Sequence, residues 1–250
     1  MKVYKNINYS SVSPKYNKLC LLLPDDECKA VFMYMHGGGL MVKEPYDNIY
    51  PFMEQLCERG IGVATIEYRG FPEHKYPDFI NDSACAAAWV KNHIGEYTDC
   101  DKIYIGGSSA GGYLSMMLCF DKKYLNIYDL SPMDFSGFIH DAGQPTTHFN
   151  VLKSRGIDSR RVIIDEAAPL YHIGVDSEYP PMIFIVSDND MENRYEQTIL
   201  ARNTLKHFGY DESKIYMKIL NGTHCHYINC DENDYIFSDI VTDFINKTQK

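Results

Sequence analysis

The feature that most constrains how this chain can fold is a short stretch of small residues, Gly107-Ser108-Ser109-Ala110-Gly111-Gly112. The apolar run Ile103–Ile105 precedes it, and apolar residues at helical spacing follow it. Glycines on both sides of Ser109 leave room for a sharp turn that a side chain would crowd. We therefore expect a buried strand, a tight turn with Ser109 at its tip, and a helix that begins directly after the turn.

Strand-like and helix-like segments alternate along the chain. The strand-like runs are Ala30–Met35, Ile61–Tyr68, Lys102–Gly106, Ser136–His140, Met182–Ser187 and Lys214–Leu220. The helix-like runs are Ile49–Arg59, Phe79–His93, Ala110–Phe120, Arg194–Phe208 and Tyr235–Asn246. This alternation predicts an α/β fold with a mostly parallel central sheet and helices on both faces. Because no linker divides the 250 residues, we expect one domain over 1–250.

One interval, from Asp141 to Pro181, interrupts the alternation and contains no clear strand. A loop of this length inside a compact domain is usually functional or a small inserted element. We predict a small lid or pocket wall at about residues 141–180, in which Phe149 and Tyr171 are candidate lining residues. A solvated insertion without a role, or aromatic residues that belong to the core, is the alternative.

The composition argues against several classes of partner. The formal net charge is −10, and an acidic surface repels the phosphates of nucleic acids and of anionic lipids, so we expect neither partner. No run approaches the roughly 18 apolar residues of a spanning helix, and the first residues lack the apolar segment of a secretory signal. The eight cysteines show no CxxC pair or metal-finger spacing, which favours a reducing, cytoplasmic location.

Ser109 is the candidate nucleophile, because a strand-to-helix turn of this kind pushes the serine hydroxyl outward. Ser108 is a neighbouring alternative, but it lacks the symmetric glycine spacing. The pattern Gly-x-Ser-x-Gly also occurs by chance, and then the small residues would only pack a strand against a helix. The other groups that acyl transfer by serine requires are a base, an acid that orients it, and donors for the oxyanion.

The oxyanion donors are expected in another glycine-rich stretch, His36-Gly37-Gly38-Gly39, which follows the apolar run Val31–Met35. Glycines permit a close approach, so bare backbone amides can face a developing negative oxygen. The helix after Ser109 adds an N-terminus that favours negative charge. The amides predicted to form the oxyanion hole are those of Gly38, Gly39 and Ala110. We assign His36 to holding this loop rather than to the base role.

The base is expected in a loop after a late strand, and two histidines, His224 and His226, follow Leu220 there. We expect only one of them to reach Ser109. We favour His224, which lies nearer the strand end. The competing interpretation, a metal site made by His224, Cys225 and His226, is disfavoured because adjacent ligands do not easily close a tetrahedron. We therefore expect no metal.

The orienting acid is expected after the preceding strand, where Asp188 and Asp190 both follow Ser187. With Asp190 the order serine, aspartate, histidine reads 109, 190, 224. We favour Asp190 because it lies further into the loop. Asp188 is an alternative that could instead cap the helix beginning at Arg194, and Asp141 is a less favoured substitute.

Taken together, these motifs resemble the α/β-hydrolase superfamily, and in particular esterases similar to the hormone-sensitive-lipase family. Three blocks carry the likeness: His36–Gly39, Glu67–Pro77 and Gly107–Gly112. The block Glu67–Pro77 is similar to the family's Asp-Tyr-Arg-Leu-Ala-Pro-Glu stretch and leads into the helix that contains Asp82 and Trp89. The resemblance spans roughly residues 30 to 245 and implies the α/β-hydrolase fold.

Two later segments match the family's acid and histidine regions. Pro180–Met191 places the family's aspartate on Asp190, and Gly222–Tyr227 resembles its Gly-x-x-His-Gly-Phe region, with the histidine on His224. The resemblance therefore implies the same catalytic triad that the residues suggest by themselves.

The departures from the family pattern concern the substrate more than the mechanism. Ser108 stands where the family usually has aspartate, Gly70-Phe71 replaces Leu-Ala, and Cys225 replaces glycine after the histidine. The segment before the first core strand is short, so the large N-terminal cap of many relatives is expected to be missing. A reduced cap implies an open pocket for small acyl esters or acylated sugars, as in the similar small acetyl and feruloyl esterases of gut bacteria.

The sequence thus predicts a serine hydrolase that cleaves carboxylic esters of small or short acyl groups through an acyl-enzyme, without a cofactor. Its expected partner is a small-molecule ester, and the oligomeric state stays open, with a homodimer as one candidate. An amidase of the arylformamidase type is the alternative enzyme. A non-catalytic small-molecule receptor built on the same fold is the alternative from another class.

Overall fold

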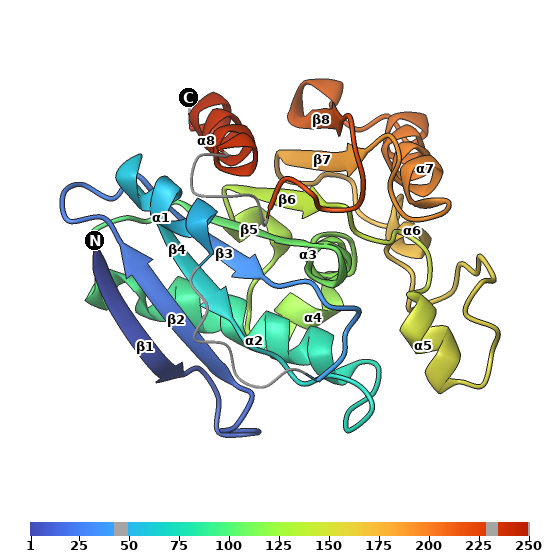
Figure 1. The fold of residues 1–250 in the computed structure, drawn as a ribbon, viewed down its shortest axis with the longest axis horizontal. Coiled ribbons are helices and arrows are strands. Elements are labelled where there is room, and N and C mark those ends of the chain that lie inside the picture. The colour runs from blue at the N-terminus through green and yellow to red at the C-terminus, as the bar shows by residue number, and fades with distance from the viewer. Residues whose placement is uncertain (43–49, 229–234, 250) are drawn as a thin grey trace.

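A computed structural model of the protein describes residues 1–42, 50–228 and 235–249 (Figure 1). In these ranges the strands form one eight-stranded sheet in the order β1-β2-β4-β3-β5-β6-β7-β8. The strands are β1 (Lys2–Asn8), β2 (Lys18–Leu23), β3 (Ala30–Met35), β4 (Ile61–Ile66), β5 (Ile103–Ser108), β6 (Gly137–Asp141), β7 (Met182–Ser187) and β8 (Ile215–Leu220). The strands from β3 to β8 are parallel, and β1 and β2 pair antiparallel at one edge.

The mostly parallel sheet confirms the predicted fold class, and the six predicted strands match β3 to β8 to within a few residues at their ends. The prediction missed β1 and β2, which precede Ala30. Six of the seven residues of β1 are exposed, so the strand has no buried face that would produce an alternating apolar pattern. The pairing of β1 with β2 is therefore visible only in the folded chain.

The longer helices match the predicted ones: α1 (Pro51–Glu58), α2 (Asp78–His93), α3 (Ala110–Phe120), α7 (Arg194–His207) and α8 (Ile236–Thr248). Ile49, the predicted start of the first of these, lies outside the described residues. Short helices are α4 (Lys123–Asn126), α5 (Phe149–Ser154) and α6 (Pro169–His172), with 3-10 turns at Ile94–Glu96, Pro132–Asp134 and Glu212–Lys214. None of the helices in the described part of the chain is long and apolar enough to cross a membrane.

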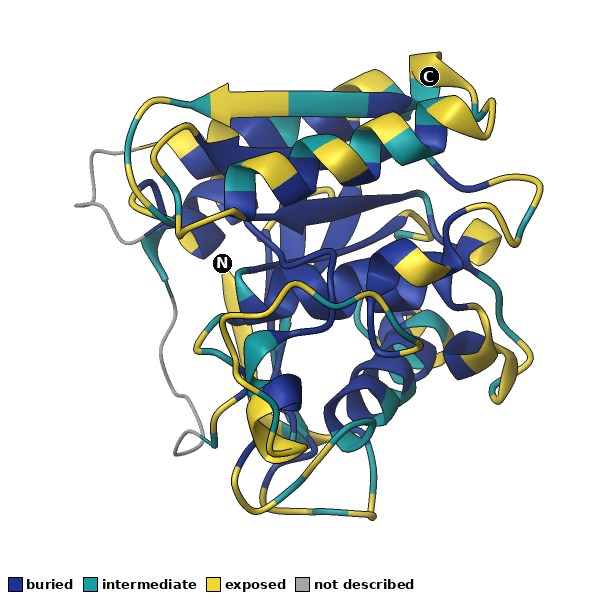
Figure 2. Ribbon diagram, turned by 90° about the vertical axis from the view of Figure 1, so that its right-hand side faces the viewer, coloured by how far each residue is buried: buried dark blue, intermediate teal, exposed yellow. Residues whose placement is uncertain are grey.

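The helices cover both faces of the sheet because β3 sends alternate side chains to opposite sides. Val31 and Met33 pack in one hydrophobic cluster with residues of α2, α3 and α7. Phe32 and Tyr34 pack in a second cluster with residues of α1 and α8. Figure 2 shows the result, with the central strands buried between helices whose outer faces are exposed. The sheet therefore forms the middle layer of three.

The segment predicted as an insertion runs from the end of β6 to the start of β7 and contains the short helices α5 and α6, with no strand assigned within it. It is anchored to the core, since the Tyr113 hydroxyl of α3 donates a hydrogen bond to the carbonyl oxygen of Ala167 at 2.8 Å. Thr146 and Thr147 are also fully buried. The ends of the segment are thus packed against the sheet domain, whereas most residues from 153 to 166 are exposed, and α5 and the loop after it project at the edge of the molecule (Figure 1).

The parallel strands bring distant loops to one edge of the sheet. The register places Met35 beside Gly107, Ser108 beside Asp141, and Ser187 beside Leu220. Each of these residues lies at or near the carboxyl end of its strand. The loops that leave these ends are where ligands bind in open α/β sheets, so the predicted functional residues emerge on a single side.

Candidate active site

Ser109 occupies the turn between β5 and α3 in a backbone conformation that non-glycine residues rarely adopt, with φ 56° and ψ −110°. The turn is held from two sides, because the Ser109 amide donates to the Asp141 carbonyl oxygen at 2.8 Å and the Tyr113 amide donates to the Ser109 carbonyl oxygen at 3.0 Å. A Cβ atom at Gly111 would lie 1.8 Å from the carbonyl oxygen of Met35, so only glycine allows the helix to start this close to β3.

The hydroxyl of Ser109 belongs to a chain of three side chains that come from three different loops. The Nε2 atom of His224 lies 2.8 Å from the Ser109 Oγ atom. The Nδ1 atom of the same ring lies 2.5 Å from the Oδ1 atom of Asp190. The Asp190 side chain is completely buried, whereas that of His224 is 24% exposed. The structure therefore brings together the three residues that the sequence analysis selected for the triad.

Asp190, the acid of this triad, is held in its ionised form. Burial raises the pKa of Asp190, but the hydrogen bond and positive charge of His224 and the hydrogen bond from the Met191 amide outweigh it, so the pKa lies below the usual range. The Arg194 guanidinium, itself buried, adds a favourable charge. An ionised carboxylate at Nδ1 holds the imidazole in the tautomer whose Nε2 accepts a proton.

The alternative residues have other partners. The His226 side chain is exposed, and its Nδ1 atom lies 2.8 Å from the Thr223 carbonyl oxygen. Asp188 accepts a hydrogen bond from the Gly222 amide at 2.9 Å, on the loop that carries His224. The alternative role considered for Asp188, capping α7, is not found, since Asn193 occupies the N-cap position and has no side-chain cap bond. Asp188 instead holds the loop that carries His224, through its hydrogen bond with Gly222.

The loop after β8 is also fixed to β7 by backbone contacts. The Ser187 hydroxyl donates to the Thr223 carbonyl oxygen at 2.8 Å, and the Asp188 amide donates to the Leu220 carbonyl oxygen at 2.8 Å. Further along, the Tyr227 hydroxyl donates to the Asp141 carboxyl group. These contacts tie the segment around His224 to β7 and to the end of β6. The fold itself therefore sets the position of the imidazole.

The glycine loop after β3 runs directly beside the serine turn. A Cβ atom on Gly37 would lie 3.3 Å from the Cβ atom of Ser109. Gly38 and Gly39 have φ 115° and 66°, which glycine adopts without strain. No described residue accepts a hydrogen bond from the amides of Gly38, Gly39 or Ala110. The three predicted oxyanion donors thus lie around Ser109 with their N–H groups unengaged by the described chain.

His36 supports this loop, as the sequence analysis expected of it. Its ring stacks on that of Tyr68 with a centroid distance of 4.5 Å, and its Nε2 atom lies 3.5 Å from the Oε2 atom of Glu67. The Tyr68 hydroxyl donates to the His36 carbonyl oxygen at 2.7 Å. Arg69, in the same block, forms a two-pronged pair with the buried Asp82 of α2, at 2.8 Å for both bonds. The block thus acts as a support for the glycine loop.

Known proteins with this architecture were found by sequence and by shape. Residues 21–129, which include the glycine loop and Ser109, match the model of the BD-FAE family. Esterase B from Lactobacillus rhamnosis superposes with a TM-score of 0.76 at 15% identity, over 99% of this chain and 86% of that one. A truncated carbohydrate esterase from gut microbiota superposes with a TM-score of 0.77 at 18% identity, over 100% of this chain and 97% of that one. The chain has the α/β-hydrolase fold.

Curated relatives of this chain are esterases by name. The probable carboxylic ester hydrolase LipM of Mycobacterium tuberculosis is 29% identical over 181 residues, covering 64% of this chain and 41% of its own length. Esterase LipQ of the same organism is 24% identical over 236 residues, covering 86% of this chain and 54% of its own length. The chain therefore spans about half the length of these relatives.

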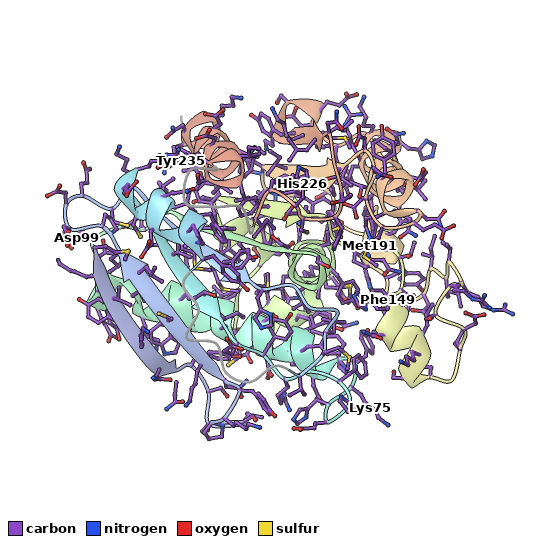
Figure 3. The ribbon with its side chains drawn as sticks, in the orientation of Figure 1. Lys75, Asp99, Phe149, Met191, His226 and Tyr235 are labelled. Atoms are coloured by element: carbon purple, nitrogen blue, oxygen red, sulfur yellow. The ribbon has the colours of Figure 1, made fainter. Side chains whose placement is uncertain are left out.

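A pocket of about 380 Å³ opens at Ser109. Its lining comprises Tyr34, Gly37, Gly38, Gly39, Tyr50, Ser108, Ser109, Phe149, Met191, His224, Cys225 and Ile228. Phe149 reaches it from the insertion and Met191 from the loop after β7 (Figure 3). Tyr171, the other aromatic candidate, is 58% exposed and is not part of this lining. A larger hollow of about 680 Å³ near Met1 contains none of the triad residues.

The sequence analysis missed most of the apolar lining, which includes Tyr34, Tyr50, Met191 and Ile228. These residues come from separate elements, and no local pattern distinguishes a side chain that faces a pocket from one that faces the core. Periodicity identifies Tyr34 as a strand residue without saying that the strand ends beside a cavity.

Asp141 and Ser108 form a buried polar group at the pocket. Ser108 lies beside both the phenol of Tyr34 and the carboxyl group of Asp141. Burial raises the pKa of Asp141 to about 7, against the lowering effects of Ser108, Tyr227 and His224. Asp141 accepts a hydrogen bond from Tyr227, and Asp190 rather than Asp141 lies beside the imidazole. Within the described ranges, no group of three or more histidine, cysteine or acidic side chains is placed to hold a metal ion.

Proposed function

We propose that this α/β-hydrolase is a serine carboxylesterase that cleaves esters of small or short acyl groups through an acyl-enzyme. The observation that carries the proposal is the hydrogen-bonded chain from Ser109 through His224 to Asp190, with distances of 2.8 Å and 2.5 Å. A nucleophile, a base and an orienting acid in this order are the groups that acyl transfer requires. The esterase names of LipM, LipQ and the structural neighbours support the same reaction class.

In this mechanism the Nε2 atom of His224 takes the proton of Ser109 as the Oγ atom attacks the ester carbonyl carbon. The amides of Gly38, Gly39 and Ala110 donate to the oxyanion that forms, and each such donor typically contributes on the order of 2.7–4 kcal/mol to the transition state. Ionised Asp190 stabilises the imidazolium. His224 then protonates the leaving alcohol, and a water molecule that His224 activates releases the acid from Ser109.

The lining of the pocket supports a neutral substrate. Apart from His224, the described lining contains no aspartate, glutamate, lysine or arginine, and aromatic and aliphatic side chains such as Phe149 and Met191 form its walls. A cavity of about 380 Å³ is small enough to favour a short acyl chain. Acylated sugars are included in the proposed substrate class because a neighbour in shape is a carbohydrate esterase from gut microbiota. A cytoplasmic location stays a prediction from composition.

The proposal is tested by measuring the hydrolysis of 4-nitrophenyl esters from acetate to octanoate with the wild type and with Ser109→Ala. We expect turnover of the short esters and a loss of kcat on the order of 10⁵–10⁶-fold in the variant, because the nucleophile is removed. Ser108→Ala is the matched control and should retain most of the activity. Circular dichroism and thermal unfolding show whether each variant is folded.

A fluorophosphonate probe separates the enzyme from a binding protein of the same fold. It should label the wild type and not Ser109→Ala. Activity that survives in Ser109→Ala, or is lost only in Ser108→Ala, would contradict the assignment of the nucleophile. If the wild type cleaves a formanilide and none of the esters, the protein is an amidase. If it neither reacts with the probe nor turns over any ester or amide, the proposed function is wrong.

A further inference from the structure

Two cysteines lie opposite each other where β3 and β5 begin. The parallel register pairs Val31 of β3 with Ile103 of β5, and the Val31 amide donates to the Lys102 carbonyl oxygen at 2.8 Å. Cys28 and Cys100 each precede a member of this pair by three residues. Neighbouring strands are about 4.7–4.9 Å apart, and a disulfide requires Cα atoms about 4.4–6.8 Å apart. The two cysteines lie just before the first residues of these two neighbouring strands, whose spacing matches the span of a disulfide.

The two side chains also point to the same side of the sheet. Both Cys28 and Cys100 pack against the hydrophobic cluster that contains Val31 and Ile103. Each thiol lies close enough to the other to shift its pKa. The Cys28 Sγ atom is further held 3.2 Å from the Ala30 carbonyl oxygen, and the Cys100 Sγ atom 3.7 Å from the Lys102 carbonyl oxygen. The thiols are thus neighbours, and each is held by a carbonyl oxygen two residues further along the chain.

Small molecules can reach this pair. Cys28 and Cys100 are half-buried and line a surface hollow of about 410 Å³ together with Thr98 and Asp99. By contrast, Cys119 is fully buried in α3. Asp99 lies at the opposite side of the molecule from Phe149 and Met191, which line the active-site pocket (Figure 3). The hollow is therefore a separate feature, at the other end of the parallel strands from Ser109.

The contact makes the two thiols chemically unequal. The hydrogen bond with Cys100 lowers the pKa of the Cys28 thiol to about 6, although burial opposes the change. The same contact and burial raise the pKa of the Cys100 thiol. A thiolate is the form that attacks a disulfide, so Cys28 is the group ready to react at neutral pH and Cys100 is positioned to resolve the product.

We propose that Cys28 and Cys100 form a redox modification site that takes a small-molecule disulfide of the glutathione type and becomes an intramolecular disulfide. The Cys28 thiolate attacks one sulfur of the small disulfide, forming a mixed disulfide and releasing one small thiolate, which takes a proton from water. Cys100 then loses its proton to solvent and attacks the Sγ atom of Cys28. The second small thiol leaves, so two protein thiols are oxidised and one small disulfide is reduced to two thiols.

The link would join two strands whose cysteines are far apart in sequence, and a disulfide that closes a long loop mainly restricts the unfolded chain. We therefore expect the oxidised protein to be more stable by roughly 5–15 °C in Tm. The proposed esterase activity should be nearly the same in both forms, because the link lies at the opposite ends of the strands from Ser109.

The test is to incubate the full chain with glutathione disulfide, block the remaining thiols and map peptides without reduction. The expected result is the loss of two hydrogen atoms from the intact mass, one link between Cys28 and Cys100, and the rise in Tm, all reversed by dithiothreitol. Cys100→Ser should stop at a stable glutathione adduct on Cys28, and Cys28→Ser should form neither adduct nor link. Cys85→Ser, which removes another half-buried thiol, should behave like the wild type.

Three results would overturn the proposal: no link between these residues, a link that uses another cysteine such as Cys57, or a link only between two chains. If Cys28→Ser does not fold, Cys100→Ser and Cys100→Ala still decide the matter, since both must trap the adduct on Cys28. These outcomes do not depend on ester hydrolysis, so they are independent of the proposed function.

Discussion

Asn150, at the start of α5, donates a hydrogen bond from its side-chain amide to the carbonyl oxygen of Gly39 at 2.5 Å. The same helix is capped by His148, whose Nδ1 atom accepts from the Asn150 amide at 3.2 Å. The insertion between β6 and β7 is thus attached to the loop that carries the proposed oxyanion donors. A residue of the insertion therefore positions a backbone segment more than 100 residues earlier in the chain.

Replacing Asn150 with alanine should lower kcat for a short ester about tenfold with little change in KM. The lost hydrogen bond is worth about 0.5–1.5 kcal/mol, and about 1.4 kcal/mol corresponds to a factor of ten. Steady-state kinetics on 4-nitrophenyl acetate measures both constants. Lys153→Ala, an exposed change on the same helix, is the control. If both variants match the wild type, Asn150 does not position the glycine loop.

The choice between the two histidines has a direct test. His224→Ala should lose kcat on the order of 10⁴–10⁶-fold, because the base beside Ser109 is removed. His226→Ala should stay within about twofold of the wild type, since its ring is exposed and its Nδ1 atom lies beside the Thr223 carbonyl oxygen rather than beside Ser109. The same kinetic assay compares the two variants. The opposite pattern would transfer the base role to His226.

The two aspartates after β7 can be distinguished by amide substitutions that conserve their shape. Asp190→Asn should lower kcat by about 10⁴-fold, because an amide at Nδ1 favours the tautomer whose Nε2 cannot accept the Ser109 proton. Asp188→Asn keeps an oxygen for the Gly222 amide and should change kcat only slightly. Thermal unfolding must show that both variants fold. Equal losses in the two variants would argue against a specific role for Asp190.

The buried Asp141 should make stability depend on pH in an unusual direction for an acid. Burial raises its pKa to about 7 in the folded protein, whereas an aspartate in an unfolded chain titrates near ~3.9. Between these values the folded state binds more protons than the unfolded state, so the free energy of unfolding falls as pH rises. The contribution is fully present below pH ~4 and is lost as pH rises through about 7.

Asp141→Asn removes this titration and keeps an oxygen that can accept from Tyr227. The stability of the variant relative to the wild type should therefore increase from pH 5 to pH 8, on the order of 2–3 kcal/mol. Denaturant unfolding at both pH values gives the difference, and other titrating groups cancel because both proteins share them. A difference that does not change with pH would mean that Asp141 is ionised in the fold at both values.

Much of the sheet follows from local patterns, because buried parallel strands are continuous apolar runs and their helices have a period near 3.6. The strands β3 to β8 were predictable for this reason. The edge strand β1 was not, since its side chains are almost all exposed and its pairing with β2 supplies the order. The Gly-x-Ser-x-Gly turn was predictable because the steric conflict that it avoids, between Gly111 and Met35, recurs wherever a helix begins against a neighbouring strand.

The candidate site likewise has parts that the sequence determines and parts that only the folded chain determines. The sequence by itself determined the turn at Ser109, the glycine loop and the short lists from which Asp190 and His224 were selected, because each depends on steric and hydrogen-bonding rules that act over a few residues. Only the tertiary structure decided that Asp190 rather than Asp188 meets the imidazole and that Asn150 reaches Gly39. These contacts join residues far apart in the chain, and their geometry is set by the register and the paths of loops over the sheet.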